Sequence, residues 1–397
     1  MIAENYREML NAKSEIRKMS QAATKRGEEI GYENVFDYSL GNPSVPVPSE
    51  FTDALIKMLQ NEDPVKLHGY SPTLTLPSVR KDTAESLKRR FGIPYTMDEI
   101  FMVSGAAAAI AHAVRAVTVP GDEVITFAPF FPEYKPYINL SGAVLKVVPA
   151  DNSGFQINFD EFVSMLNPKT MAVLINTPNN PSGIVYSTQT IQKLTDLLRE
   201  KQKEYGHDIY LLSDEPYREI VFEGVDAPCV SKFYDNTIVC YSFSKSLSLP
   251  GERIGYIAVN PACKDAKLII QMCGQISRGI GHNCPASLMQ LGVANVLDLT
   301  SDLKVYETNM NIIYHVLMEL GFTCVKPGGT FYIFPKALEE DAVAFCQKAM
   351  KYDLYLVPGD SFGCPGYFRM AYCITTQKVE RSMIAFRKFV ETEYPNR

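Results

Sequence analysis

Three short stretches of the sequence follow apolar runs and carry polar side chains that could do chemistry. The stretch "NTPNNPSG" supplies Asn180, "SDEPY" supplies Asp214 and Tyr217, and "YSFSKSLSLPGERIGY" supplies Lys245 and Arg253. An amide, a carboxylate beside a phenol, and a lysine between hydroxyl groups could together bind a small polar molecule and exchange protons with it.

A phosphate-binding site is also indicated. The stretch "SGAAAAI" begins a predicted helix at Ser104 and Gly105, and free N–H groups at a helix N-terminus attract anions. Ser242, Ser244 and Arg253 could add hydroxyl groups and a fixed positive charge. A lysine, an acid and a phosphate site match the needs of pyridoxal phosphate, which forms a Schiff base with lysine and needs a carboxylate at its ring nitrogen.

These residues stand at the ends of predicted strands. The apolar runs predict strands in 122–129, 143–150, 171–178, 208–216, 237–244 and 253–260, with helices over 104–117 and 187–205. Apolar strands separated by helices indicate an α/β fold with a mostly parallel central sheet covered by helices. Ligands of such sheets bind beyond the carboxyl ends of the strands, so we expect the polar residues to meet at one edge.

The length of 397 residues favours two domains. Residues 1–30 have the pattern of an amphipathic helix, and the Pro-rich stretch 41–48 reads as a connector. After residue 285 a long helix is expected to lead into an α+β tail with "GTFYIFP" as a strand. We predict a large cofactor-binding domain over 49–285 and a smaller α+β domain built from 1–48 and 286–397.

Composition argues against several classes of protein. The net charge of −6 disfavours nucleic-acid binding and a basic membrane surface, and neither a signal peptide nor an apolar membrane span is found. The nine cysteines form no CxxC pair, which indicates free thiols in a reducing compartment, so a cytoplasmic location is expected. The five histidines are scattered, and no metal site is predicted.

The motifs together resemble one known family. In the family's order they are "LGNP", "GYSPTLTLPSVR", "SGAAAAI", "APFFPEY", "NTPNNPSG", "SDEPY", "SFSKSLSLPGERIGY", "PGGTFY" and "PGDSFGCPGYFRMAY". From about Tyr38 to Cys373 the chain resembles the fold-type I pyridoxal-phosphate enzymes of the aspartate aminotransferase superfamily, class I/II. The resemblance implies an aminotransferase that moves an amino group from an L-amino acid to a 2-oxo acid, and a homodimer with shared active sites.

The resemblance also implies roles around the cofactor ring. Lys245 matches the lysine that holds the cofactor and later acts as general acid and base, and Asp214 matches the carboxylate that keeps the ring nitrogen protonated. Tyr217 and Asn180 match the pair that hydrogen-bonds the 3′ oxygen of the ring. Phe131 matches the aromatic residue that stacks on the ring, with Phe130 as the alternative.

Further matches concern the phosphate and the substrate. The implied phosphate-binding residues are Gly105, Ala106, Ala107, Ser242, Ser244 and Arg253, with Tyr70 reaching in from the neighbouring subunit. Arg369 matches the arginine that binds the substrate α-carboxylate, and Gly41 lies in the segment that closes over the substrate. Arg278 stands about where other members place an arginine for a second substrate carboxylate, which would favour aspartate or glutamate.

Two positions depart from the family pattern. Thr75 stands where the family usually has glycine, so a different local turn is expected there. Ala107 stands where some aspartate-specific members have a lysine for the side-chain carboxylate. The second departure leaves Arg278 as the candidate for that carboxylate.

Other functions remain to be weighed. A pyridoxal-phosphate lyase that eliminates a β-substituent from cysteine S-conjugates would begin with the same removal of the Cα proton, and a neutral or aromatic amino acid could replace an acidic donor. The string "SFSK" also fits the S-x-x-K motif of penicillin-binding proteins, but the accompanying S-D-N and K-T-G are absent. A DNA-binding regulator is disfavoured because only about 40 residues precede "LGNP".

Overall fold

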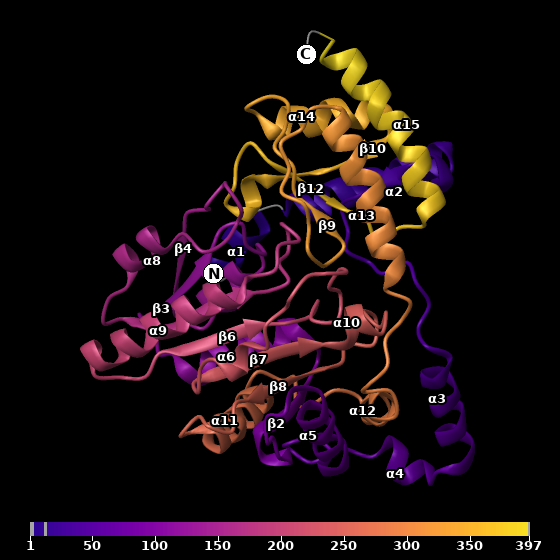
Figure 1. Cartoon of the computed structure of the whole chain (residues 1–397). Coiled ribbons are helices and arrows are strands. Elements are labelled where there is room, and N and C mark those ends of the chain that lie inside the picture. The colour runs from indigo at the N-terminus through magenta and orange to yellow at the C-terminus, as the bar shows by residue number, and fades with distance from the viewer. Residues whose placement is uncertain (1–3, 12–13, 396–397) are drawn as a thin grey trace.

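Figure 1 shows a computed structural model of the chain, which describes residues 4–11 and 14–395. A large sheet with its helices lies in the lower part of the view, and a smaller unit ending in helix α15 (Thr376–Glu393) lies above it. This smaller unit is built from both ends of the chain, as the indigo and yellow ribbons show.

The large sheet has seven strands in the order β2-β8-β7-β6-β5-β3-β4. Their bounds are β2 Ile100–Val103, β3 Glu123–Phe127, β4 Val144–Val148, β5 Thr170–Asn176, β6 Tyr210–Asp214, β7 Thr237–Ser242 and β8 Gly255–Val259. Strand β8 runs antiparallel to both its neighbours, and the other pairs are parallel. The predicted mostly parallel α/β sheet is therefore confirmed.

Side chains of successive strand residues pack on opposite faces of this sheet. Leu174 and Leu212 belong to the apolar cluster that includes α6, whereas Val173 and Leu211 belong to the cluster that includes α9. The helices whose residues join the first cluster are α6 (Ala106–Val117), α7 (Tyr134–Asn139) and α11 (Ala266–Gly279). Those of the other face are α5 (Pro77–Phe91), α8 (Phe159–Met165), α9 (Thr188–Tyr205) and α12 (Ser287–Ala294). Burial on both faces explains why these strands read as continuous apolar runs.

Helix α9 begins and ends where its sequence predicts. The Ser187 side chain accepts a hydrogen bond from the Thr190 N–H at 3.0 Å, which satisfies a free donor of the first turn. Gly206 ends the helix with a φ of 75°, a left-handed conformation that glycine adopts at little cost.

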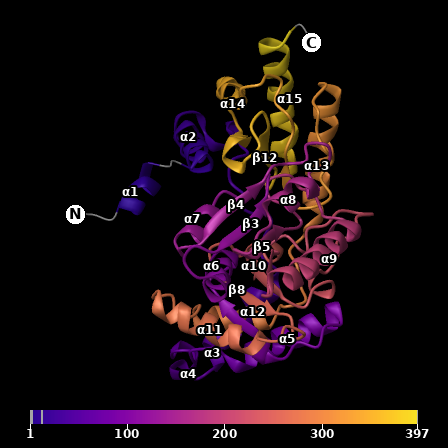
Figure 2. The ribbon, with the colours of Figure 1, turned by 90° about the vertical axis from the view of Figure 1, so that its left-hand side faces the viewer.

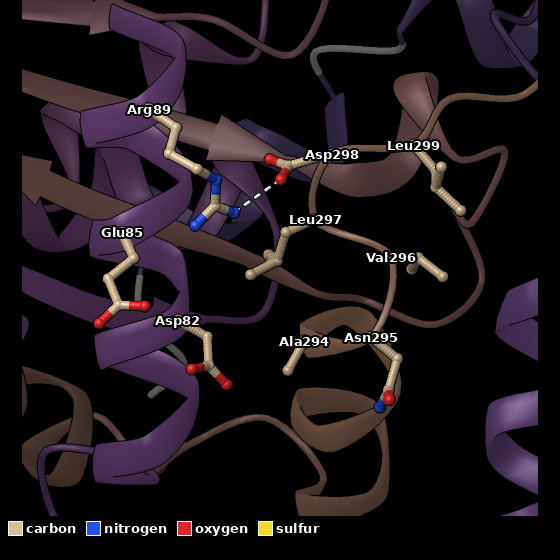
Figure 3. A pocket seen from close by; sticks show the side chains of 9 residues that line it. All are labelled: Asp82, Glu85, Arg89, Ala294, Asn295, Val296, Leu297, Asp298 and Leu299. Atoms are coloured by element: carbon tan, nitrogen blue, oxygen red, sulfur yellow. Dashed lines mark hydrogen bonds and ion pairs between the residues drawn. The ribbon is translucent and has the colours of Figure 1, made fainter. Parts of the chain in front are cut away.

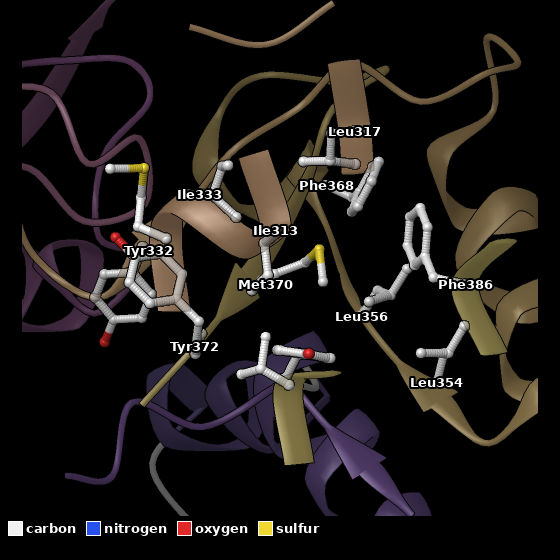
Figure 4. Close-up of a cluster of buried hydrophobic side chains, with 14 of the residues drawn as sticks. Ile313, Leu317, Tyr332, Ile333, Leu354, Leu356, Phe368, Met370, Tyr372 and Phe386 are labelled. Atoms are coloured by element: carbon white, nitrogen blue, oxygen red, sulfur yellow. The ribbon is translucent and has the colours of Figure 1, made fainter. Parts of the chain in front are cut away.

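The smaller unit joins the two ends of the chain. Strand β1 (Phe36–Asp37) pairs with β10 (Leu354–Tyr355), and β11 (Val357–Pro358), β12 (Phe368–Ala371) and β9 (Tyr332–Ile333) form an antiparallel sheet. Its helices are α2 (Glu15–Ile30), α13 (Lys304–Glu319), α14 (Ala342–Ala349) and α15. Figure 4 shows part of the apolar core to which α13, α14, α15 and strands β1, β9, β10 and β12 contribute.

Several predicted elements differ in the structure. Residues 1–30 hold two helices, α1 (Glu4–Asn11) and α2, and residues 12–13 between them lie outside the described part. The long helix expected after residue 285 is broken into α12 and α13, and "GTFYIFP" forms a strand only at Tyr332 and Ile333. Helices α3 (Ser49–Asn61), α4 (Pro64–His68) and α10 (Phe243–Ser246) complete the description.

Thr75 keeps a backbone conformation that usually requires glycine. Its φ is 70° and its side chain is buried. The Met102 N–H donates a hydrogen bond of 3.4 Å to the Thr75 hydroxyl oxygen. Thr75 therefore adopts a left-handed backbone conformation, and this hydrogen bond offsets part of the strain.

Two further findings concern the chain as a whole. All nine cysteines are unpaired thiols. Within residues 4–11 and 14–395, no helix is both long and apolar enough to cross a membrane.

Candidate active site

Most of the predicted site residues meet at a cavity of about 390 Å³, which lies beyond the carboxyl ends of β5, β6 and β7. Its walls also include the start of α6, helix α10, the segment after β1, the first turn of α2, and residues of β9 and β12. This is the edge of a parallel sheet at which ligands bind.

Lys245 enters the cavity from α10, directly after β7. Its Nζ donates a hydrogen bond of 2.6 Å to the carbonyl oxygen of Gly41. Burial is the main cause that lowers the pKa of Lys245 to about 8; Cys373 opposes this shift, and the nearby Arg253 and Arg369 add to it. A larger share of neutral amine is therefore present near neutral pH, as a nucleophile or base requires.

Asp214 lies at the end of β6 and is buried. Its Oδ2 accepts a hydrogen bond of 2.5 Å from the Tyr134 hydroxyl, but its Oδ1 has no hydrogen-bond partner among the described residues. Burial raises the pKa of this carboxyl to about 7, although the bond from Tyr134 lowers it. A buried carboxylate oxygen without a donor is costly, so this atom suits a cationic N–H from a ligand.

Arg369 enters the cavity from β12 and is almost completely buried, with 1% of its surface exposed. Its Nη1 donates to Asn180 Oδ1 at 3.0 Å, and its Nη2 donates to the Ser39 carbonyl oxygen. Its Nε is also without a partner in the described part of the chain. A buried guanidinium with an unused donor is suited to a carboxylate ligand.

The predicted phosphate end is formed by α6, α10 and Arg253. Gly105 precedes α6 with a φ of 85°, and a Cβ at this position would lie 2.8 Å from Arg253 Nη2. Arg253 Nη2 donates to the Ser104 carbonyl oxygen at 3.1 Å, and the hydroxyl groups of Ser242 and Ser244 lie 2.7 Å apart. Helix N-terminal N–H groups, hydroxyls and a guanidinium thus face one end of the cavity.

Most of the residues predicted from the sequence line this one cavity. They are Gly41, Ala106, Ala107, Phe131, Asn180, Asp214, Tyr217, Ser242, Ser244, Lys245, Arg253 and Arg369. Phe131 lines the cavity, whereas Phe130 is packed in the apolar core beside it. The geometry therefore favours Phe131 over Phe130 as the aromatic wall.

Tyr70 and Arg278 lie outside the cavity of their own chain. Tyr70 is fully exposed after α4, and Arg278 is exposed in the last turn of α11. The segment that follows Tyr70 packs on α11, because a Cβ at Gly274 would lie 2.6 Å from the Leu74 side chain.

Sequence reasoning missed several residues of this site, of which four bear on its chemistry. Tyr134 and Asn176 touch Asp214, since the Asn176 side chain donates to the Asp214 carbonyl oxygen at 2.8 Å. Tyr332 and Arg17 line the cavity from β9 and from the first turn of α2. Asn176 ends a predicted strand and could have been found, but the others depend on contacts between distant parts of the chain.

A second cavity, of about 340 Å³, lies between α5 and the segment after α12 and shares no lining residue with the first. Figure 3 shows its charged residues, among which Arg89 and Asp298 form an ion pair of 2.6 Å. The two side chains are 58% and 46% exposed. Exposed, paired charges of this kind are weak interactions, and we assign no chemistry to this cavity.

Comparison with known proteins gives a consistent result. The sequence model of the family described as "Aminotransferase class I and II" matches residues 33–386. An aspartate aminotransferase of Thermotoga maritima is 28% identical over 95% of this chain and 96% of its own. An aromatic-amino-acid aminotransferase of Thermococcus litoralis is also 28% identical, over 97% of both chains. The crystal structure of an aminotransferase from Eubacterium rectale is similar with a TM-score of 0.95 and 43% identity, over 99% of both chains.

Proposed function

The chain belongs to the aminotransferase class I and II family, and from that premise we propose that it uses pyridoxal phosphate to move an amino group from an L-amino acid to a 2-oxo acid. The observation that carries the proposal is the pair of buried, unpartnered atoms in the cavity that also holds Lys245: Asp214 Oδ1 and Arg369 Nε. One calls for a cationic N–H and the other for an anionic oxygen.

The residues present fit the cofactor. Asp214 Oδ1 would hold the ring nitrogen in its protonated form, the start of α6 with Arg253 would hold the phosphate, and Lys245 would form the covalent bond. Phe131 supplies an aromatic wall for the ring. When bound, the cofactor supplies an electron sink for the carbanion at the substrate Cα.

The chain itself would orient the substrate and move the proton. Arg369 binds the α-carboxylate through its free donor, and the bond from Arg369 to Asn180 keeps the guanidinium in place. Lys245 Nζ, whose pKa is lowered to about 8 by burial, is then the base for the Cα proton. Arg369 is almost completely buried and Lys245 is half-buried, which limits the access of water to the proton transfer.

Elimination remains the second candidate, because removal of the Cα proton is common to both reactions. The family match and the relatives described above favour transfer. Incubation with an amino donor but no oxo acid separates the two: transfer converts the cofactor once to its amine form, whereas elimination releases pyruvate and ammonia continuously. Continuous pyruvate release from a cysteine S-conjugate would contradict the aminotransferase proposal.

We further propose a homodimer in which Tyr70 completes the phosphate site of the neighbouring subunit. Support comes from the exposed apolar side chains near Tyr70, namely Ile56, Leu59 and Val65. Large exposed apolar side chains grouped on adjacent helices are typical of a surface that another protein covers.

Mixed dimers test this arrangement. Tyr70→Ala and Lys245→Ala are each expected to retain less than about a tenth of wild-type activity. The first variant lacks a hydrogen bond to the phosphate, and the second lacks the covalent bond to the cofactor. After subunit exchange, about a quarter of wild-type activity should return, since half of the subunits enter mixed dimers with one complete site each. No recovery, in a mixture shown by mass spectrometry to contain mixed dimers, would contradict a shared site.

For the substrate, we propose an acidic amino donor whose second carboxylate contacts Arg17. Relatives at the same identity act, by their names, on aspartate or on aromatic amino acids, so they favour neither class. Arg17 lines the cavity, and no ion-pair partner of Arg17 is found among the described residues. Arg278 is the competing cation, and it would have to come from the other subunit.

Arg17→Ala is expected to lower kcat/KM for aspartate and glutamate roughly tenfold, because Arg17 is exposed and its charge is screened. Phenylalanine should lose little or nothing. Arg278→Ala is the matched comparison. If only Arg278→Ala damages the acidic donors, the second carboxylate is bound by the neighbouring subunit; if both variants affect all three donors equally, the acidic preference is wrong.

The remaining expectations are also proposals. The predicted boundaries, 49–285 for the larger domain and 1–48 and 286–397 for the smaller one, stay a proposal except at α12 (Ser287–Ala294), which packs on the large sheet and so belongs with the larger domain. The nine free thiols support a reducing compartment such as the cytoplasm.

A further inference from the structure

Tyr332 connects three parts of the cavity that the sequence does not link. It lies in β9 with 3% of its surface exposed, at the edge of the core drawn in Figure 4, and it lines the cavity. Its ring belongs to the apolar core of the smaller unit, so its position is fixed from behind.

The hydroxyl of Tyr332 lies 3.1 Å from the hydroxyl of Tyr217. Within the described residues this is the hydrogen bond found for the Tyr217 hydroxyl. Each hydroxyl of such a pair carries one proton. One hydroxyl donates its proton to the other oxygen atom, and the second hydroxyl can then donate its own proton to a ligand. The direction in which Tyr217 can donate therefore depends on Tyr332.

The same hydroxyl is packed against Gly41. A Cβ at Gly41 would lie 1.9 Å from the Tyr332 hydroxyl oxygen, so only glycine allows this approach. The carbonyl oxygen of Gly41 in turn accepts the 2.6 Å hydrogen bond from Lys245 Nζ. The segment at Gly41, which accepts the hydrogen bond from Lys245, thus packs against Tyr332.

The ring of Tyr332 supports Arg369. The guanidinium carbon of Arg369 lies 4.7 Å from the centre of this ring and 5.0 Å from the centre of the Phe362 ring. Cation–π contacts are stronger away from water, and Arg369 is almost completely buried. The two rings thereby help to hold a buried charge in place.

We propose that Tyr332 is a positioning residue with two separable parts: its hydroxyl orients the Tyr217 hydroxyl toward the cofactor, and its ring holds Arg369 for the substrate carboxylate. The inference rests on the proposed function, because both ligands belong to it. A residue that served only the core would affect folding but neither ligand selectively.

The hydroxyl is tested by the dissociation constant of pyridoxal phosphate from the cofactor-free protein, measured by equilibrium dialysis. Tyr332→Phe is expected to weaken binding roughly three- to tenfold, the loss of one hydrogen bond. Binding of propionate to the cofactor-loaded protein should change little, since the ring remains. Tyr186→Phe is the matched control, because Tyr186 is equally buried at 3% exposure and lies in a different apolar cluster.

The ring is tested with Tyr332→Leu and, as a second apolar replacement, Tyr332→Met. Propionate, which has the carboxylate but no amino group, should bind about three to thirty times more weakly to either variant than to Tyr332→Phe. Melting temperatures separate this effect from a general loss of stability.

Two outcomes would overturn the inference. Equal cofactor affinity in Tyr332→Phe and Tyr186→Phe would remove the role of the hydroxyl, and unchanged propionate affinity in both ring variants would remove the role of the ring. A wild-type protein that binds no pyridoxal phosphate would instead contradict the proposed function itself.

Discussion

Lys245→Ala is expected to lower the rate of amino transfer by about 10³- to 10⁴-fold, because one side chain supplies both the covalent attachment and the base. Lys245 is half-buried, and its Nζ contacts only the Gly41 carbonyl oxygen among the hydrogen-bond acceptors of the described residues. Alanine should leave the fold intact, since a half-buried amine with one hydrogen bond contributes little net stability.

The attachment site can be identified directly. Borohydride treatment of the cofactor-loaded wild-type protein, followed by peptide mass spectrometry, should place the cofactor on the peptide that contains Lys245. Lys135→Ala is a suitable control, because Lys135 is exposed and lies outside the cavity. A label on any other lysine would exclude the assignment.

The lowered pKa of Lys245 also predicts how stability depends on pH. Burial lowers this pKa from 10.5 to about 8, so between these values the folded protein binds fewer protons than the unfolded chain. The free energy of unfolding of the cofactor-free protein therefore gains a contribution that rises with pH across this window. Lys245→Ala should remove that rise in urea titrations at a series of pH values.

The sequence predicted the sheet well because its strands are buried on both faces and read as apolar runs. It could not show that β8 runs antiparallel, since strand direction depends on partners far along the chain. Strand β2 was missed because four apolar residues beside a helix carry no period of their own. The break between α12 and α13 was missed because the sequence between them contains neither Gly nor Pro.

The site was predictable where a strand end delivers the residue. Asn180, Asp214 and Lys245 follow consecutive parallel strands, and the topology brings such ends together. Tyr134, Tyr332 and Arg17 come from other elements, and their approach depends on how the smaller unit and α7 pack on the sheet. Such packing contacts have no local signal in the sequence.

Asp214→Asn is expected to leave cofactor binding largely intact but to lower turnover by about 10²- to 10³-fold, the effect of losing one preorganised electrostatic contact worth roughly 3 kcal/mol. The amide keeps the shape of the side chain, and Tyr134 can still donate to its oxygen. What it lacks is the negative charge that would hold a ring nitrogen in its protonated form.

The cofactor-free protein offers an independent measurement of the same carboxyl. Burial raises the pKa of Asp214 from 3.8 to about 7, so in this window the folded protein binds more protons than the unfolded chain. The free energy of unfolding therefore loses a contribution as pH rises from about 4 to 7, by roughly 1.4 kcal/mol for each unit of pKa shift. Asp214→Asn, which cannot ionise, should flatten this part of the curve.

The two measurements together distinguish a catalytic carboxylate from a merely buried one. Asp235→Asn is the control for both, because Asp235 is exposed in the loop before β7. If Asp214 serves only the fold, Asp214→Asn should change the pH dependence of stability and leave turnover near that of Asp235→Asn. If it holds the cofactor nitrogen, turnover falls while the cofactor-free protein becomes more stable near pH 7, since a buried charge has been removed. Normal turnover in Asp214→Asn would exclude the role, because the unpartnered Oδ1 would then face nothing that the reaction needs.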